Sequence, residues 1–197
     1  MENQPKAVRD FVSMKVKSIF NNSKKESYAR ASLAKLRRGI GKNPGSLPDI
    51  WEHTLEGLPE EFLSKTGEPT YAEWATYLAI TLFALHQQGK DWDKKPMSVS
   101  GQKIGEAVRK YAPKDDPSEE AVKRRFDAAV TSDSPEELAH HLRVIVQLLK
   151  SKDIPLDYPQ LAEDLFRFQF PESRDGVRLS WGQSYYLIRK DTDKNEG

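Results

Sequence analysis

The sequence predicts an all-α protein of eight or nine helices that form two small packed helical bundles. Apolar residues recur at intervals of three and four in most segments, which is the period of an amphipathic helix. Several of these segments open with a helix-start signal, and no stretch combines period-two alternation with hairpin turns. Because 37% of the 197 residues are hydrophobic and 10% are aromatic, the chain can build a buried core.

Two helices are predicted in the basic N-terminal segment. The first is marked by the apolar stripe Phe11, Val12, Val16, Ile19 and Phe20. Lys15 and Lys17 fall off this stripe. The second helix, Ser27–Arg38, is rich in Ala and Leu and ends at Gly39, where glycine can adopt the left-handed conformation of a C-cap.

A buried central helix is predicted next. A short helix, Asp49–Leu55, has Pro48 in its first turn. Thr70 and Glu73 then match a capping box that opens the most apolar segment, Tyr71–His86. A helix that is apolar nearly all round is expected to be central. The polar, turn-rich stretch 89–96 follows it, and it predicts an N-terminal subdomain at residues 1–94 and a C-terminal bundle at 95–197.

The second subdomain is predicted to contain five helices. Ser134 and Pro135 form a start signal, and Asp157 is placed to cap the helix after it. The expected spans are Ser100–Tyr111, Glu119–Val130, Pro135 to about Lys150, Tyr158–Phe168, and a last helix spaced by Val177, Trp181, Tyr185 and Ile188. The tail 191–197 is expected to be frayed.

Composition excludes several classes of function. The chain has no cysteine, which rules out disulfides, thiolate metal sites and a thiol nucleophile. No apolar run reaches the ~20 residues of a membrane span, and the N-terminus lacks the apolar core of a signal peptide. The cytoplasm is therefore the expected location.

Catalytic and metal-binding motifs are also missing from the sequence. The adjacent His140 and His141 would point about 100° apart on a helix, so they do not make a metal pair. No metalloprotease, calcium-loop or serine-nucleophile motif is present. We therefore expect no enzyme activity, no metal, no cofactor and no small-molecule substrate.

Charge is distributed unevenly along the chain. Residues 1–43 hold 11 Lys and Arg against 3 Asp and Glu, whereas residues 44–93 hold 2 against 9. Within the basic segment, Arg30 and Arg37 are seven residues apart and share a helix face, with the small Ala34 between them. Arg38 and Lys42 follow. Because residues 27–48 contain no acid, these cations favour a phosphate-binding ridge over a solvated face with surface ion pairs.

Further basic residues lie beside the apolar stripes of the second subdomain. They are Lys103, Arg109, Lys110, Lys123, Arg124, Arg125 and Arg143. In a bundle these side chains could converge on one nucleic-acid-binding groove, although each alone is more typical of plain surface.

An ordered set of segments resembles the CasB family, the small subunit of the type I-E CRISPR surveillance complex, Cascade. The set begins with RASLAKLRRG at 30–39, a loop and Trp51. It continues with RFDA at 125–128 and Thr131, HLR at 141–143, IPLDY at 154–158 and LAEDL at 161–165. It closes with VRLSWG at 177–182 and Tyr185-Tyr186.

The resemblance implies an all-α, non-enzymatic subunit present as two copies in the complex. It implies contacts with the backbone and large subunits, with guide RNA and with target DNA, whose R-loop the basic surface stabilises. Arg37 and Arg38 match the arginine pair of the family motif, and Arg125 and Arg143 fall inside other matched segments. Lys103, Arg109, Lys110, Lys123 and Arg124 fall outside the clearest matches.

Two other functions stay open at the level of the sequence. A helical protein–protein adaptor without nucleic-acid contact would also show segregated charge, and the acidic segment 44–93 would suit basic neighbours. A metal-dependent nuclease built from dispersed carboxylates is disfavoured because no ligand constellation is present.

Overall fold

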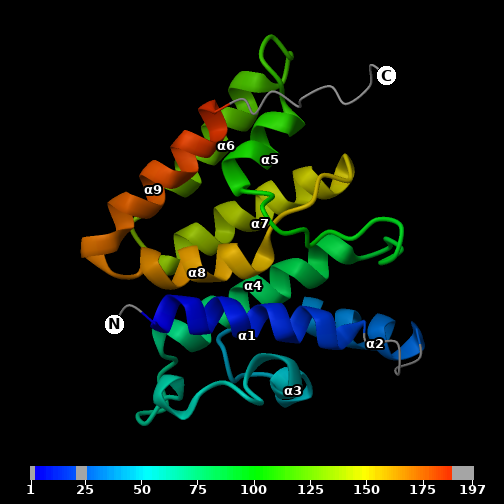
Figure 1. The fold of residues 1–197 in the computed structure, drawn as a ribbon, viewed down its shortest axis with the longest axis vertical. Helices are drawn as coiled ribbons and strands as arrows, with labels where there is room; N and C mark the ends of the chain where they lie inside the picture. The colour runs from blue at the N-terminus through cyan, green and yellow to red at the C-terminus, as the bar shows by residue number, and fades with distance from the viewer. Residues whose placement is uncertain (1–2, 21–25, 188–197) are drawn as a thin grey trace, which may run out of the picture.

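The protein is described by a computed structural model that covers residues 3–20 and 26–187. Within these residues nine α-helices and two short 3₁₀ helices form an all-α fold without strands, which confirms the predicted class (Figure 1). The α-helices are α1 (Gln4–Ile19), α2 (Glu26–Arg37), α3 (Trp51–Thr54), α4 (Tyr71–Gln87), α5 (Ile104–Tyr111), α6 (Glu119–Val130), α7 (Pro135–Ser151), α8 (Tyr158–Phe168) and α9 (Pro171–Tyr186). The 3₁₀ helices span Pro48–Ile50 and Glu60–Phe62.

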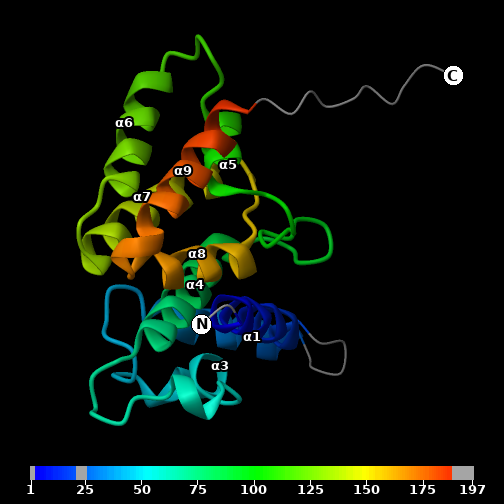
Figure 2. The ribbon, with the colours of Figure 1, turned by 60° about the vertical axis from the view of Figure 1, so that its left-hand side comes forward.

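Helix α4 is the central element, as its apolar composition predicts. The capping box opens it: the Thr70 hydroxyl accepts from the Glu73 amide at 3.1 Å, and the Glu73 carboxylate accepts from the Thr70 amide at 2.7 Å. Nearly all of its residues are buried, and it packs against α1, α2, α7 and α8. Figures 1 and 2 show α1 to α3 toward one end of the long axis and α5 and α6 toward the other.

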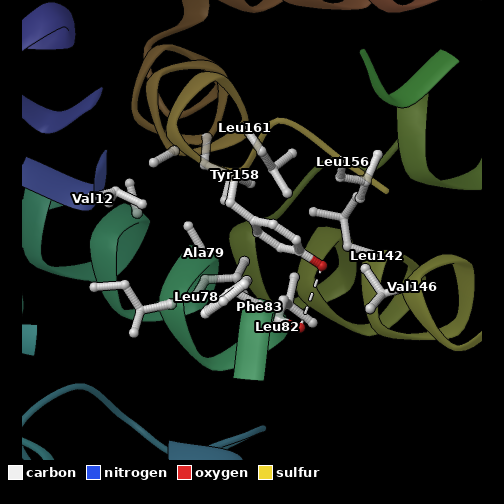
Figure 3. Packing of buried hydrophobic residues seen from close by; sticks show 14 of the residues in the cluster. Val12, Leu78, Ala79, Leu82, Phe83, Leu142, Val146, Leu156, Tyr158 and Leu161 are labelled. Atoms are coloured by element: carbon white, nitrogen blue, oxygen red, sulfur yellow. Dashed lines mark hydrogen bonds between the residues drawn. The ribbon is translucent and has the colours of Figure 1, made fainter. Parts of the chain in front are cut away.

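The hydrophobic core crosses the predicted subdomain boundary. Helix α1 packs along α8, and a cluster of buried hydrophobic residues draws members from both sides of residue 94. Tyr158 extends from α8 between α4 and α7, and its hydroxyl donates to the Leu82 carbonyl at 3.3 Å (Figure 3). The division at 94/95 remains a prediction, and the two sets of helices meet at a shared apolar contact.

Gly39 follows the end of α2 at Arg37, and it is not the left-handed C-cap that the sequence predicts. Positive φ angles occur at Gly41 and Gly45 but not at Gly39, so it is not a left-handed cap. The Tyr77 hydroxyl donates to the Gly39 carbonyl at 2.7 Å, and a Cβ atom at Gly39 would lie 2.7 Å from that hydroxyl oxygen. A side chain at this position would displace the Tyr77 hydroxyl and so weaken the contact between the α2 segment and α4.

Lys15 is buried although it falls off the apolar stripe of α1. Its relative exposure is 6% because α3 covers this side of the helix. The ammonium donates to the Glu52 carbonyl at 2.5 Å and lies 3.6 Å from a Glu56 carboxylate oxygen. Hydrogen bonding to the neighbouring segment thus compensates the burial of the charge.

Two predicted spans differ from the structure. The helix expected at 100–111 begins only at Ile104, because the preceding loop binds the start of α8: the Asp157 carboxylate accepts from the Gly101 amide at 2.7 Å. The helix expected at 49–55 is divided into a 3₁₀ turn and the short α3. Ile188 and the tail 191–197 lie outside the described residues.

Candidate nucleic-acid interface

The arginine ridge of α2 lies along a groove. Arg30 and Arg37 line the same groove of about 890 Å³, as their spacing of seven predicts. The Arg30 guanidinium pairs with Glu26 at 2.6 Å, and that of Arg38 pairs with Asp49 at 2.8 Å. Arg37 and Lys42 have no ion pair within 4 Å among the described residues. Two cations of the ridge are therefore paired with carboxylates, and the other two are open to an external anion.

Arg37 converges with two cations that sequence reasoning did not single out. Lys90 follows α4 and lines the same groove, and Lys150 lies in the last turn of α7. Burial lowers the pKa of Lys150 from its usual value, and the positive charges of Arg37 and Lys90 lower it further. The Lys150 ammonium donates to the Gln88 side-chain oxygen at 2.9 Å. We call Arg37, Lys90 and Lys150 the α2–α7 cation cluster.

One carboxylate partly balances this cluster. Asp153 accepts hydrogen bonds from Lys90 and from Lys95, the latter at 2.5 Å. Asp153 adopts a positive φ of 55° just after α7. Lys90 and Lys95 thus share one carboxylate, whereas Arg37 and Lys150 have no acidic partner within 4 Å among the described residues, and these two cations make this side of the groove attractive to phosphate.

Arg143 extends the positive surface along α7. Arg143 and Gln147 are exposed, Lys150 is half-buried, and the spacing of four and three places them on one helix face. Two turns of helix, about 10 Å, separate Arg143 from Lys150. Of the residues predicted in the second subdomain, Arg143 is therefore the one that shares a helix face with the cation cluster.

Most predicted cations of α5 and α6 are instead bound to acids. Arg109 is mostly buried and pairs with Glu119 at 2.5 Å, and its guanidinium lies 5.4 Å from the centre of the Tyr185 ring. The other pairs are Lys110–Glu106 at 2.9 Å, Lys123–Asp127 at 2.5 Å and Arg124–Glu120 at 3.9 Å. We call these four pairs the α5–α6 ion-pair region.

Lys103 and Arg125 are not ion-paired in the described part of the chain. Lys103 precedes α5 and lines a small cavity of about 120 Å³, and the Arg125 guanidinium donates to the Ala121 carbonyl at 3.0 Å. Since α5 and α6 lie at the opposite end of the molecule from α2 (Figures 1 and 2), these residues do not share the groove of Arg37.

Two further titratable groups have shifted pKa values. Burial, reinforced by the charges of Lys150 and Lys90, lowers the pKa of His86 to about 3. Its Nδ1 atom lies 2.9 Å from the Tyr158 hydroxyl. Burial raises the pKa of Asp164 to about 6, although its carboxylate accepts from Trp181 at 2.7 Å and from Gln160 at 3.0 Å. His86 belongs to the packed interior, whereas Asp164 is half-buried and lines the same small cavity as Lys103.

The described residues form neither a metal site nor a membrane-spanning helix. No three or more His, Asp or Glu side chains in the described ranges gather as metal ligands. None of the helices described here has the length and apolarity to cross a bilayer.

Comparisons with known proteins agree with the fold. The family of CRISPR-associated protein Cse2 (CRISPR_cse2) matches residues 32–186. The crystal structure of CasB from Thermobifida fusca is similar with a TM-score of 0.70 and 34% identity, over 92% of this chain and 98% of that chain. CasB from Thermus thermophilus shares the fold with a TM-score of 0.62 and 24% identity, over 93% and 97% of the two chains. No curated protein sequence matched. The chain therefore belongs to the Cse2 family of CRISPR-associated proteins, and this membership implies a subunit of a CRISPR Cascade complex.

Proposed function

We propose that this chain is a non-catalytic, nucleic-acid-binding subunit of a type I-E CRISPR effector complex. In this role it stabilises the R-loop of guide RNA and target DNA by holding the sugar–phosphate backbone. The observation that carries the proposal is the α2–α7 cation cluster, in which Arg37 and Lys90 line a groove and the Lys150 ammonium donates at 2.9 Å to Gln88, which lines the same groove.

The physical chemistry of R-loop formation suits such a surface. The RNA–DNA hybrid is about as stable as the DNA duplex that it replaces, so backbone contacts can tip the balance. Contacts with phosphate require Arg and Lys but no base-reading motif and no active site. Arg37 supplies a planar guanidinium for bidentate contact, whereas Lys90 and Lys150 act as point charges. Arg30, Arg38, Lys42 and Arg143 would extend the track on either side.

The partners in this proposal are the backbone and large subunits of the complex and a second copy of the chain. Carboxylates of segment 44–93 are candidates for contact with basic neighbours, because Glu60 and Glu61 are exposed. The remaining expectations are a cytoplasmic location and no cofactor.

The decisive experiment compares two double variants in the assembled complex. Arg37→Ala with Lys150→Ala removes two charges from the cluster, and Lys123→Ala with Arg124→Ala removes two from the α5–α6 ion-pair region as a matched control. We expect the first variant to weaken target-DNA binding and to reduce the slope of log affinity against log salt by up to about two units. An unchanged affinity and slope for the first variant would contradict the proposal.

An adaptor function without nucleic-acid contact is the second candidate, and the surface of α9 favours it. Leu179 and Tyr186 are seven residues apart on this helix and are 62% and 69% exposed. Apolar side chains repeated along one face suit contact with another protein. An adaptor predicts partner capture that survives nuclease treatment, and no retention of DNA even at low salt.

A further inference from the structure

The groove beside α2 combines an apolar floor with a charged rim. The apolar residues are Ile19, Phe20, Ala29, Leu33 and Trp92. The rim includes the cations Arg30, Arg37 and Lys90 and the acids Glu26, Asp91 and Asp93. Its volume, about 890 Å³, is within the range of small-molecule sites, roughly 300–1,000 Å³. A backbone contact alone would not require an apolar, aromatic floor.

Trp92 is held at this groove by aromatic packing. Its indole stacks on Phe20 with ring centres 4.0 Å apart and an angle of 4° between the planes. Phe83 meets both rings edge-on, at 6.0 Å from Trp92 and 6.1 Å from Phe20. Trp92 is nevertheless only half-buried. A stacked aromatic pair with part of its surface open is a platform on which a further planar group can pack.

The loop that carries Trp92 is held in place by the buried side chain of Gln87. The side-chain amide of Gln87 donates to the carbonyls of Lys90 and Lys95, each at 3.2 Å, and its oxygen accepts from the Met97 amide at 2.8 Å. Gln87 itself is buried. The indole therefore keeps its position before any ligand arrives, which reduces the entropy lost on binding.

We propose that this groove holds one unpaired nucleotide, with its base against Trp92 and its phosphate at the α2–α7 cation cluster. The inference rests on the proposed function and adds to it the class of ligand, a single-stranded nucleic acid. Bases of a duplex are stacked on their neighbours and cannot enter the groove, whereas every unpaired base has a free face for an aromatic ring.

The acids on the rim set the direction of the nucleotide. Asp91 accepts from the amides of Asp93 and Lys94 at 3.0 and 3.3 Å and lies 3.7 Å from the Lys94 ammonium, whereas Asp93 has no ion pair within 4 Å among the described residues and keeps a negative charge at the loop beside Trp92. A phosphate is repelled there and is attracted at Arg37 and Lys150. Charge thus places the phosphate toward α7 and leaves the loop side for the base.

The test uses the full isolated chain and three labelled ligands of equal length at low salt. They are oligothymidylate, an abasic deoxyribose–phosphate strand and a DNA duplex, and anisotropy reports binding. We expect the wild-type chain to bind oligothymidylate about fivefold to thirtyfold more tightly than the abasic strand, because one stacked base adds to the phosphate contacts. Equal affinities would overturn the inference, and this comparison requires no variant.

Substitution of Trp92 then locates the effect. Trp92→Leu should lose the preference for oligothymidylate, whereas Trp92→Phe should keep most of it. Trp74→Leu is the matched control, because Trp74 is also a half-buried tryptophan but lies near the start of α4. It is 13 residues before Gln87, about 20 Å along the helix, and therefore far from the groove. Circular dichroism and thermal melting check that each variant folds.

Three other outcomes would contradict the inference, and they differ in what they imply for the proposed function. A chain that binds all three ligands equally, with Trp92→Leu harmless, retains the proposed function but has no base site. If Trp92→Leu blocks assembly of the complex and leaves oligothymidylate binding intact, a protein segment occupies the groove. If the chain binds none of the ligands, the inference fails, and the salt dependence of the assembled complex decides the proposed function separately.

Discussion

Two cationic regions of this molecule contain the same kinds of residue in opposite electrostatic settings. In the α2–α7 cation cluster, burial and then the charges of Arg37 and Lys90 lower the pKa of Lys150, and Asp153 is the carboxylate bound to Lys90. In the α5–α6 ion-pair region each cation has its own acid, as in the pair of Arg109 with Glu119 at 2.5 Å. Helix α2 lies toward one end of the fold and α6 toward the other (Figure 1), whereas the end of α7 that holds Lys150 reaches α5, where the Lys152 ammonium donates to the Tyr111 carbonyl at 2.7 Å.

This difference shows that the number of cations in a region does not by itself indicate phosphate binding. Whether each cation already has a carboxylate partner is more informative. Like charges held together raise the free energy of the folded state, and a bound anion relieves that cost. Exposed ion pairs contribute little to stability, about 0–1 kcal/mol each, and their acids compete with phosphate for the cation. A bound polyanion therefore stabilises the α2–α7 cation cluster more than the α5–α6 ion-pair region.

The largest predicted contrast comes from reversing one charge in each region. Lys150→Glu places a carboxylate beside Arg37 and repels phosphate, so we expect target binding by the complex to weaken about thirtyfold or more. Lys123→Glu reverses a charge beside Asp127 and should weaken binding less than about threefold. Gel-shift titration at fixed salt measures both. Equal losses in the two variants would show that total charge, rather than the cluster, governs binding.

A smaller effect, on stability rather than binding, is predicted for Arg109. Its guanidinium bonds Glu119, lies against the Tyr185 ring and is mostly buried. Arg109→Ala should therefore lower the free energy of unfolding by about 1–2 kcal/mol and leave nucleic-acid binding unchanged. Arg124→Ala, whose side chain is exposed, is the control and should change stability by less than about 0.5 kcal/mol. Urea unfolding decides the point, and a loss of binding with unaltered stability would place Arg109 in the interface.

Local sequence signals are sufficient for features that depend on neighbours in the chain, although we predicted only the capping box from them and not the ion pairs of α6. The capping box of Thr70 and Glu73 needs only a spacing of three and is present as predicted. The pairs Glu120–Arg124 and Lys123–Asp127 follow the spacing of four that joins side chains on one helix face. That spacing was available in the sequence, and it indicates that α6 cations are occupied.

Contacts between distant segments could not be predicted from such signals. Lys90 and Lys150 are 60 residues apart, and no periodicity brings them to Arg37. Gly105 is a similar case: a Cβ atom there would lie 2.2 Å from the Trp181 carbonyl, so the crossing of α5 and α9 requires glycine. Gly39 likewise resembles a helix cap in sequence, and only the position of Tyr77 shows what a side chain there would displace. These features depend on tertiary packing, which one sequence does not encode as a local pattern.

The smallest predicted effect tests whether an ion pair withholds a cation from phosphate. Arg38 adjoins Arg37 but binds Asp49 at 2.8 Å, and both side chains are more than half exposed. Asp49→Asn should release Arg38 and strengthen target binding by a few-fold, with the salt slope increased by up to about one unit. Folding should be unaffected because the pair is exposed. Glu172→Gln removes an exposed acid at the start of α9 and is the matched control. If Asp49→Asn changes nothing while Arg38→Ala weakens binding as much as Arg37→Ala, then Arg38 engages phosphate despite its partner, and pairing does not distinguish the two regions.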